Sequence, residues 1–222
     1  MTITFLDLYN ECASQPWSMF DADTESIDDF EGALKISINK AISYLWNFQN
    51  WSFRLSKMII KTRSGKNSYT MPDGNLSKKT INGIQKYNIK YNGFYLDPVI
   101  DFEQLKQKSG EPEQFYIEND NLYIYPTPDN IYIINLSYFL LPYGLNKDDE
   151  EIYELKQEED YINIPEKYEI LFKNCVISLA MMYAIADETD ENYSGYRKQY
   201  DDSLNILLMY CKNNIVDRNI VW

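Results

Sequence analysis

The residues best suited to chemistry form an acidic cluster in the second half of the chain. Its seven members are Asp148, Asp149, Glu150, Glu151, Glu158, Glu159 and Asp160. Such a cluster could chelate a divalent cation or supply paired carboxylates for cleavage of a glycosidic bond. Its spacing has neither the alternating ligands nor the central Gly of an EF-hand loop. We therefore interpret residues 143–163 as an acidic exposed loop.

Other common catalytic motifs lack their starting residues. The chain has no histidine, which removes the commonest general base and the commonest metal ligand. It has no C-x-x-C, G-x-S-x-G, G-x-G-x-x-G or P-loop pattern. The sequence thus predicts no catalytic residue, no cofactor and no metal site, and we expect a protein that is not an enzyme.

Tyrosine is abundant, with 20 residues in 222. Tyr116, Tyr123, Tyr125 and Tyr132 lie in a strand-rich region and could stack on sugars or bases. Strand alternation places part of this set on a buried face, which favours a core or a protein interface. A carbohydrate-binding module that uses exposed tyrosines stays open as the alternative function.

Charge and cysteine content limit the protein class further. The 34 acidic residues exceed the 21 basic ones, so the formal charge of −13 disfavours general binding to a phosphate backbone. Cys12, Cys175 and Cys211 are too scattered for a disulfide framework and indicate a reducing compartment. The N-terminus lacks the features of a signal peptide, and no window approaches 18 uninterrupted apolar residues, so we expect no membrane association.

Helical periodicity marks both ends of the chain. Thr4 with Asp7, and Ser26 with Asp29, fit the capping box that opens a helix. The second helix carries an apolar stripe at spacings of three and four, namely Ile27, Phe30, Leu34, Ile38, Ala41, Leu45 and Phe48. A third helix follows Pro165 and is apolar nearly all round, so it should be central in a bundle. A fourth is expected over 193–211.

Between these helical blocks the period changes to two. At Trp51 the alternation begins, with Phe53 and Leu55 expected on a buried face and Arg54 facing outward. The N-G pair at 92–93 predicts a tight hairpin. Residues 110–142 are interpreted as a three-stranded meander, in whose last strand Ile134 and Leu136 share one face.

These elements predict an α+β fold. N-terminal helices in 1–51 and C-terminal helices in 164–211 should pack into one antiparallel helical bundle, because each block needs a partner for its apolar face. Residues 52–142 would form an inserted small antiparallel β-sandwich or barrel domain. Residues 212–222 would follow as an extended C-terminal tail.

The order of several short motifs resembles a known family. They are W-N-F-Q-N-W-S-F at the end of a helix, then Y-T-M-P, G-E-P-E-Q-F-Y, L-Y-I-Y-P-T-P with I-I-N-L-S-Y, and I-P-E-K-Y before a long apolar helix. Together they span about residues 27–210. On these motifs the chain resembles the head-to-tail adaptor (connector) proteins of short-tailed bacteriophages, of the tail tubular protein A type.

The resemblance implies a virion structural protein at the head–tail junction, made in the host cytoplasm. Its partners would be the portal and other tail or neck proteins, in a homo-oligomeric ring of about twelve copies that encloses the DNA channel without sequence-specific binding. The family brings no catalytic residues.

The apolar tail gives the one partner-binding site that we expect. Its candidate residues are Ile215, Val216, Ile220, Val221 and Trp222. The tail could fold back on its own bundle, or it could dock on the portal or a neighbouring subunit, as some adaptors of this type do with their C-terminal segment. We expect docking, with Trp222 as an anchor.

Overall fold

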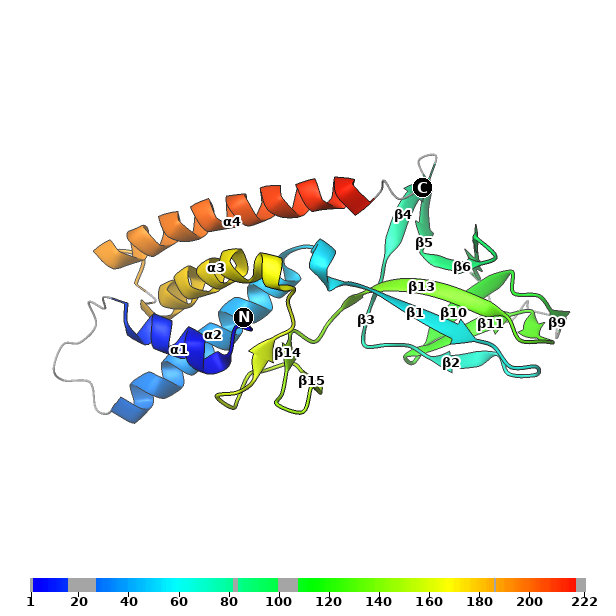
Figure 1. Cartoon of the computed structure of the whole chain (residues 1–222), viewed down its shortest axis with the longest axis horizontal. Coiled ribbons are helices and arrows are strands. Elements are labelled where there is room, and N and C mark those ends of the chain that lie inside the picture. Colours follow the sequence, from blue (N-terminus) through cyan, green and yellow to red (C-terminus); the bar gives the residue numbers. More distant parts are fainter. Residues whose placement is uncertain (1, 16–26, 82–83, 100–107, 186, 219–222) are drawn as a thin grey trace. The chain divides into compact units, whose positions relative to one another are not determined.

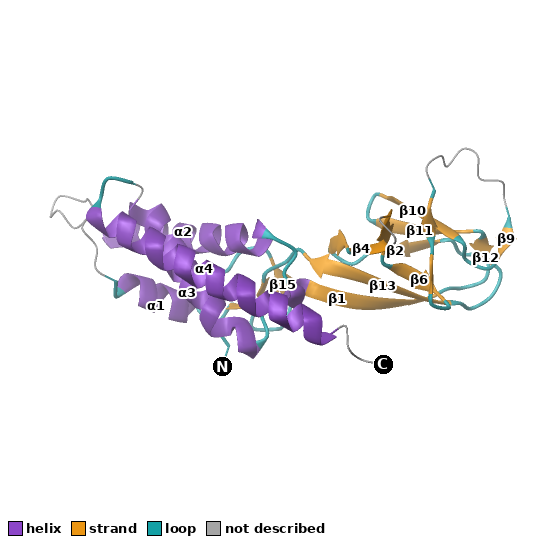
Figure 2. Cartoon of the chain, turned by 90° about the horizontal axis from the view of Figure 1, so that it is seen from above, coloured by secondary structure: helices purple, strands orange, loops and turns teal. Residues whose placement is uncertain are grey.

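A computed structural model describes residues 2–15, 27–81, 84–99, 108–185 and 187–218. The expected α+β class is confirmed, because helices at both ends of the chain flank a strand-rich middle (Figures 1 and 2). The chain forms two compact units. The helical unit comprises Met1–Phe53 with Pro142–Trp222, and the β unit comprises Arg54–Leu141.

Four α-helices build the helical unit within the described residues. They are α1 (Phe5–Ala13), α2 (Ile27–Phe48), α3 (Glu166–Ile185) and α4 (Glu191–Arg218). Helix α1 begins with the predicted capping box, since the Thr4 hydroxyl accepts from the Asp7 N–H and the Asp7 carboxylate accepts from the Thr4 N–H, each at 3.1 Å. Ser26, of the second expected cap, lies outside the described residues.

Helix α3 is the centre of the bundle, because it contacts each of the other three helices. Leu34, Ile38, Ala41 and Leu45 of the predicted α2 stripe are buried, but Phe48 is 44% exposed. Helix α3 alone among the described helices is long and apolar enough to cross a bilayer, but 61% of its apolar window is buried in the protein. Burial in the bundle accounts for that composition.

An aromatic cluster closes the end of the bundle where α2 meets α3. Trp46 lies edge-on to Phe172, with ring centroids 6.2 Å apart, and 5.7 Å from Phe53. Phe53 stacks on Trp51 at 5.5 Å and lies 5.1 Å from Tyr168. These five rings are buried, so they join the first and second helical blocks into one core.

The turn that carries Phe53 is a short 3-10 helix, η1 (Ser52–Arg54), and this corrects the predicted strand alternation. Arg54, expected outside, is buried and donates from Nε to the Leu140 carbonyl at 2.9 Å, while Leu55 is 36% exposed. Burial also lowers the pKa of the Arg54 guanidinium. The helical turn moves Phe53 into the bundle and shifts the alternation that follows it.

Two sheets form a sandwich in the β unit. The first sheet runs β1-β13-β6-β7 with β3 also on β13, and the second runs β2-β11-β10-β8. The strands of the first are β1 (Leu55–Lys61), β3 (Gly74–Leu76), β6 (Ile89–Tyr91), β7 (Phe94–Tyr95) and β13 (Ile133–Leu140). Those of the second are β2 (Ser68–Thr70), β8 (Asp97–Pro98), β10 (Gln114–Glu118) and β11 (Asn121–Tyr125).

Their facing side chains share one core, which includes Ile60, Ile89, Ile134 and Leu136 from the first sheet and Phe115, Leu122 and Ile124 from the second. Two smaller ladders complete the unit. They pair β4 (Lys78–Ile81) with β5 (Ile84–Tyr87), and β9 (Ser109–Gly110) with β12 (Thr127–Pro128).

The N-G hairpin is confirmed, with Asn92 at φ 48° and Gly93 at φ 81° between the antiparallel strands β6 and β7. The three-stranded meander is wrong in one respect. Strands β10 and β11 form a hairpin, but β13 pairs with β1, β3 and β6 in the other sheet. Crossing to that sheet lets Ile134 and Leu136 face the core from the opposite side.

Two expected irregular segments are regular instead. The segment 143–163 contains a three-stranded sheet, with β14 (Gly144–Leu145) between β15 (Glu151–Ile152) and β16 (Tyr161–Ile162). Of the expected tail, residues 212–218 instead continue helix α4, which ends at Arg218.

No disulfide joins the three cysteines, and all three are buried in the helical unit. Burial, with a smaller contribution from Glu11, raises the pKa of Cys12 to about 12, and burial raises that of Cys175 to about 12 and that of Cys211 to about 11. Because the thiolate is the nucleophile, we expect iodoacetamide at about pH 8 to alkylate the native thiols at least about 100-fold more slowly than the unfolded chain. Mass spectrometry with and without concentrated guanidinium chloride checks this. Rapid labelling of a native thiol would contradict it.

Candidate protein-interaction site

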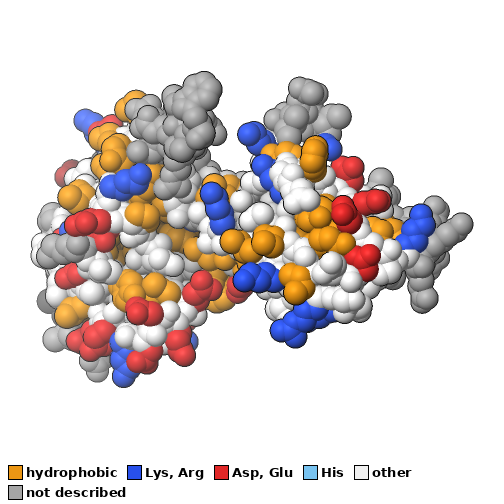
Figure 3. All heavy atoms as spheres, turned by 45° about the vertical axis from the view of Figure 1, so that its right-hand side comes forward, with side chains coloured by type: hydrophobic (Ala, Val, Ile, Leu, Met, Phe, Trp, Pro, Cys, Tyr) orange, Lys and Arg blue, Asp and Glu red, His pale blue; other side chains and the backbone are white. Residues whose placement is uncertain are grey.

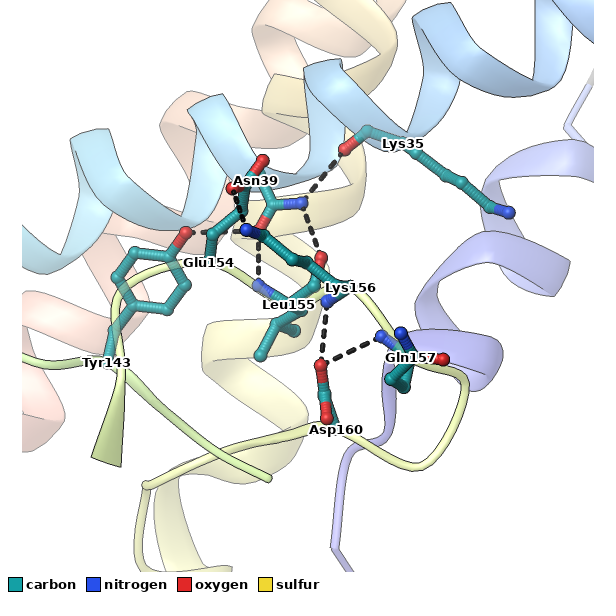
Figure 4. Close-up of polar contacts among 8 residues, drawn as sticks. All are labelled: Lys35, Asn39, Tyr143, Glu154, Leu155, Lys156, Gln157 and Asp160. Atoms are coloured by element: carbon teal, nitrogen blue, oxygen red, sulfur yellow. Dashed lines mark hydrogen bonds and ion pairs between the residues drawn. The ribbon is translucent and has the colours of Figure 1, made fainter. Parts of the chain in front are cut away.

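The acidic segment 143–163 is a structured part of the helical unit. Asp160 is 3% exposed, and its Oδ2 accepts hydrogen bonds from the N–H groups of Lys156 at 2.7 Å and Gln157 at 2.8 Å (Figure 4). Its carboxylate therefore holds a turn of the backbone. The Asp149 carboxylate accepts from the Tyr161 hydroxyl, and this hydrogen bond raises the pKa of Tyr161.

Asn39 of α2 anchors the segment to the bundle, as Figure 4 shows. Its Oδ1 accepts from the Leu155 N–H at 2.9 Å and from the Tyr143 hydroxyl at 3.0 Å. Its Nδ2 donates to the Leu155 carbonyl at 2.9 Å and to the Lys35 carbonyl at 3.2 Å. Leu155 and Tyr143 are buried, and burial raises the pKa of the Tyr143 phenol. One amide thus satisfies several partly buried polar groups at once.

The start of the chain provides a second anchor for the same segment. The Phe5 N–H donates to the Asp160 carbonyl at 2.7 Å, the Ile162 N–H donates to the Ile3 carbonyl at 3.2 Å, and Thr4 forms an antiparallel bridge with Tyr161. The segment is therefore fixed to both α1 and α2. The sequence pattern did not predict that this segment is ordered, because its buried positions, such as Leu155 and Ile162, are separated by charged residues.

The arrangement gives no support to a carboxylate enzyme or a metal centre. Asp148, Glu150, Glu151, Glu158 and Glu159 are exposed. Across the described ranges, no group of three or more Cys, Asp or Glu side chains is placed to hold a metal ion. What remains is an acidic surface that could attract a basic partner.

The tyrosines of the β unit contact other protein groups. Tyr116 of β10 and Tyr123 of β11 stack on each other, with centroids 4.4 Å apart and planes 9° from parallel. Tyr132 lies edge-on to Tyr91 at 5.2 Å, and its hydroxyl donates to the Asp129 carboxylate, which raises the pKa of Tyr132 to about 12. Tyr125 is half-buried. The stacked pair covers one face of each ring, which weakens the case for a sugar platform.

The predicted tail site lies mostly beyond what the structure describes. Helix α4 includes Ile215 and Val216, but the structure describes side chains of this helix only as far as Cys211. Ile220, Val221 and Trp222 lie outside the described residues. Docking through these five residues stays a prediction.

Large apolar side chains on the surface are the feature that sequence reasoning missed. Ile170 of α3 is 70% exposed, and Ile59 of β1 is 61% exposed. The available signal was the run K-M-I-I-K, in which an alternating strand must turn one of two adjacent isoleucines to solvent. A contiguous exposed apolar patch marks a protein contact surface, whereas a single exposed isoleucine is normal on any surface.

Comparison with known proteins gives the family of the chain. No curated protein matches the chain significantly. The family described as SU10 adaptor protein matches residues 3–219, and this range includes the whole β unit and nearly all of the helical unit. The match agrees with a site made of contact surfaces and confirms the predicted adaptor class. The chain belongs to the SU10 adaptor protein family and is a structural protein of a bacteriophage.

Proposed function

We propose that the chain is a subunit of a ring that docks beneath the portal and joins the capsid to the tail. The observation that carries this proposal is the adaptor-family match over both units. The exposed apolar side chains support it, because a ring subunit needs surfaces for its neighbours. The formal charge of −13 suits a channel through which DNA passes without being held.

Electron microscopy of the purified chain mixed with the portal protein of the same phage tests the proposal. We expect a closed ring on one end of the portal, with about one copy of the chain per portal subunit. Portal particles that stay bare while the chain remains folded would contradict it. A ring of this kind would be completed in the host cytoplasm and would remain in the virion at the head–tail junction.

The tail is proposed as a portal-docking segment within this function. Deleting residues 214–222 removes the last residues of α4 and all of Ile215, Val216, Ile220, Val221 and Trp222. We expect the deletion and Trp222→Ala each to weaken portal binding by roughly thirtyfold, equivalent to about 2 kcal/mol, while the melting temperature stays nearly unchanged. Surface plasmon resonance measures the portal affinity, and a thermal melt measures the melting temperature.

Met209→Ala is the matched control, since Met209 is an exposed apolar residue of α4 upstream of the tail. It should leave portal binding within about twofold of the full chain. A truncated chain that melts several degrees lower and binds portal normally would assign the tail to its own bundle.

A further inference from the structure

The outer face of the first sheet in the β unit combines lysine with isoleucine. In β1 and β13, Met58, Ile60, Ile134 and Leu136 turn toward the sandwich core. The alternate positions turn outward, and the register places Ile59 opposite Asn135, Asn135 opposite Lys90 of β6, and Lys61 opposite Ile133. We call Lys57, Ile59, Lys61, Lys90 and Ile133 the lysine–isoleucine face.

In the described part of the β unit, the isoleucines of this face are open to solvent. Ile59 is 61% exposed and Ile133 is 52% exposed. The outward positions of β1, β13 and β6 hold no carboxylate. Lys57 and Lys61 form no ion pair with any described residue, and Lys90 lies over the Tyr95 ring at 4.5 Å. The face thus offers apolar area and uncompensated positive charge together.

Charge is divided unequally between the two units. The β unit has 11 Lys and Arg against 9 Asp and Glu, a formal charge of +2. The helical unit has 10 against 25, a formal charge of −15. Figure 3 shows several acidic side chains on the face of the helical unit that is in view. Every additional copy of the chain therefore brings a strongly acidic surface that complements the lysines.

One part of that acidic surface also has exposed apolar area. A groove of about 340 Å³ between α1 and α3 is lined by Asp7, Glu11, Glu166 and Glu169 together with Lys173, which forms an ion pair with Glu11. Ile170, which is 70% exposed, belongs to the same lining. Acidic and apolar groups thus occur together here, as lysine and isoleucine do on the sheet.

We propose that the lysine–isoleucine face binds the α1–α3 groove of a second copy of this chain. The two surfaces differ, so the contact is heterologous, and repetition of such a contact closes a ring when the rotation is suitable. Isoleucines between the lysines favour a protein surface over a DNA backbone, since phosphates offer them no apolar contact. The ring itself rests on the proposed function, whereas the copy-to-copy contact can be tested without the portal.

Charge reversal tests the contact on the full chain. We expect Lys57→Glu/Lys61→Glu and Glu166→Lys each to weaken association between copies at least tenfold in sedimentation velocity, measured alone and with portal. Lys79→Glu is the matched control, because Lys79 is exposed on β4 and lies outside the face. It should associate like the unaltered chain. Equal melting temperatures would show that all variants are folded.

Mixing the two reversed variants gives the sharpest result. The Glu166→Lys chain keeps an intact face, and the Lys57→Glu/Lys61→Glu chain keeps an intact groove. A heterologous contact therefore predicts that the mixture associates through the one intact face and the one intact groove, although neither variant self-associates. Variants that associate as the unaltered chain does, or a mixture that stays monomeric, would overturn the inference.

Other occupants of the face give different results. If the Lys57→Glu/Lys61→Glu chain self-associates normally but no longer binds a short DNA duplex, the face belongs to DNA and the inference is overturned. If that chain self-associates normally but loses affinity for the portal, the face belongs to the portal and the inference is likewise overturned. If the unaltered chain binds portal without any contact between copies, the inference fails and the portal docking stands. If copies associate through the face but never bind portal, the proposed function fails and the inference stands. A chain that stays monomeric with and without portal would overturn both.

Discussion

Replacing Trp46 by alanine is expected to lower the free energy of unfolding of the helical unit by about 3–5 kcal/mol. Trp46 is fully buried in α2, and its ring contacts Phe172 of α3 and Phe53 of η1. The substitution removes an indole from the aromatic cluster and leaves a cavity that the neighbouring rings can fill only in part. Guanidinium denaturation followed by the helical circular dichroism signal measures the loss.

Ile36→Ala is the control for Trp46→Ala. Ile36 lies in the same helix, but its side chain is 68% exposed, so its removal should change stability by no more than about 0.5 kcal/mol. A loss below about 1 kcal/mol for Trp46→Ala would mean that the cluster repacks freely. The union of the two helical blocks would then depend on other contacts.

Replacing Asn39 by leucine is expected to cost about 2–4 kcal/mol and to loosen the segment 143–163. Leucine has a similar size but can neither donate nor accept a hydrogen bond. The Leu155 N–H and carbonyl and the Tyr143 hydroxyl would lose their partner, and each unsatisfied buried group costs about 1–3 kcal/mol. Because the site is partly buried, water will recover some of this loss.

Hydrogen exchange of the amides in 143–163 measures the local part of the effect, and a denaturant titration measures the total. Asn47→Leu is the matched control, since Asn47 is exposed on the same helix and, among the described residues, its side chain donates to the Ser43 carbonyl alone, at 3.0 Å. It should leave both measurements nearly unchanged. Equal exchange of the segment in the two variants would refute the anchoring role of Asn39.

Local signals predicted the elements in which one short stretch decides the conformation. The Thr4–Asp7 capping box and the N-G turn at 92–93 depend on neighbouring residues alone, and both are confirmed. The central helix α3 was predictable because its apolar surface is continuous. In each case the sequence contains the whole physical cause.

Partners distant in the sequence were not predictable in the same way. The alternation of apolar residues predicted which face of β13 is buried. It did not predict which strands lie beside β13, so the pairing of β13 with β1 was not foreseen. The segment 143–163 is ordered by Asn39, which lies over 100 residues earlier, and no local pattern contains that hydrogen bond. The exposed surfaces around Ile59 and Ile170 were not predictable for the same reason, because the exposure of a side chain depends on the whole fold.

The β unit begins and ends on adjacent strands. Leu55 at the start of β1 pairs with Phe139 near the end of β13, and Arg54 bonds to the Leu140 carbonyl beside them. The two crossing points are therefore about 5 Å apart, which is one strand spacing. Recombination at these two points would exchange an entire β unit between related phages and leave every residue of the aromatic cluster in place. The β unit can thus diversify between related chains while the helical unit keeps its packing.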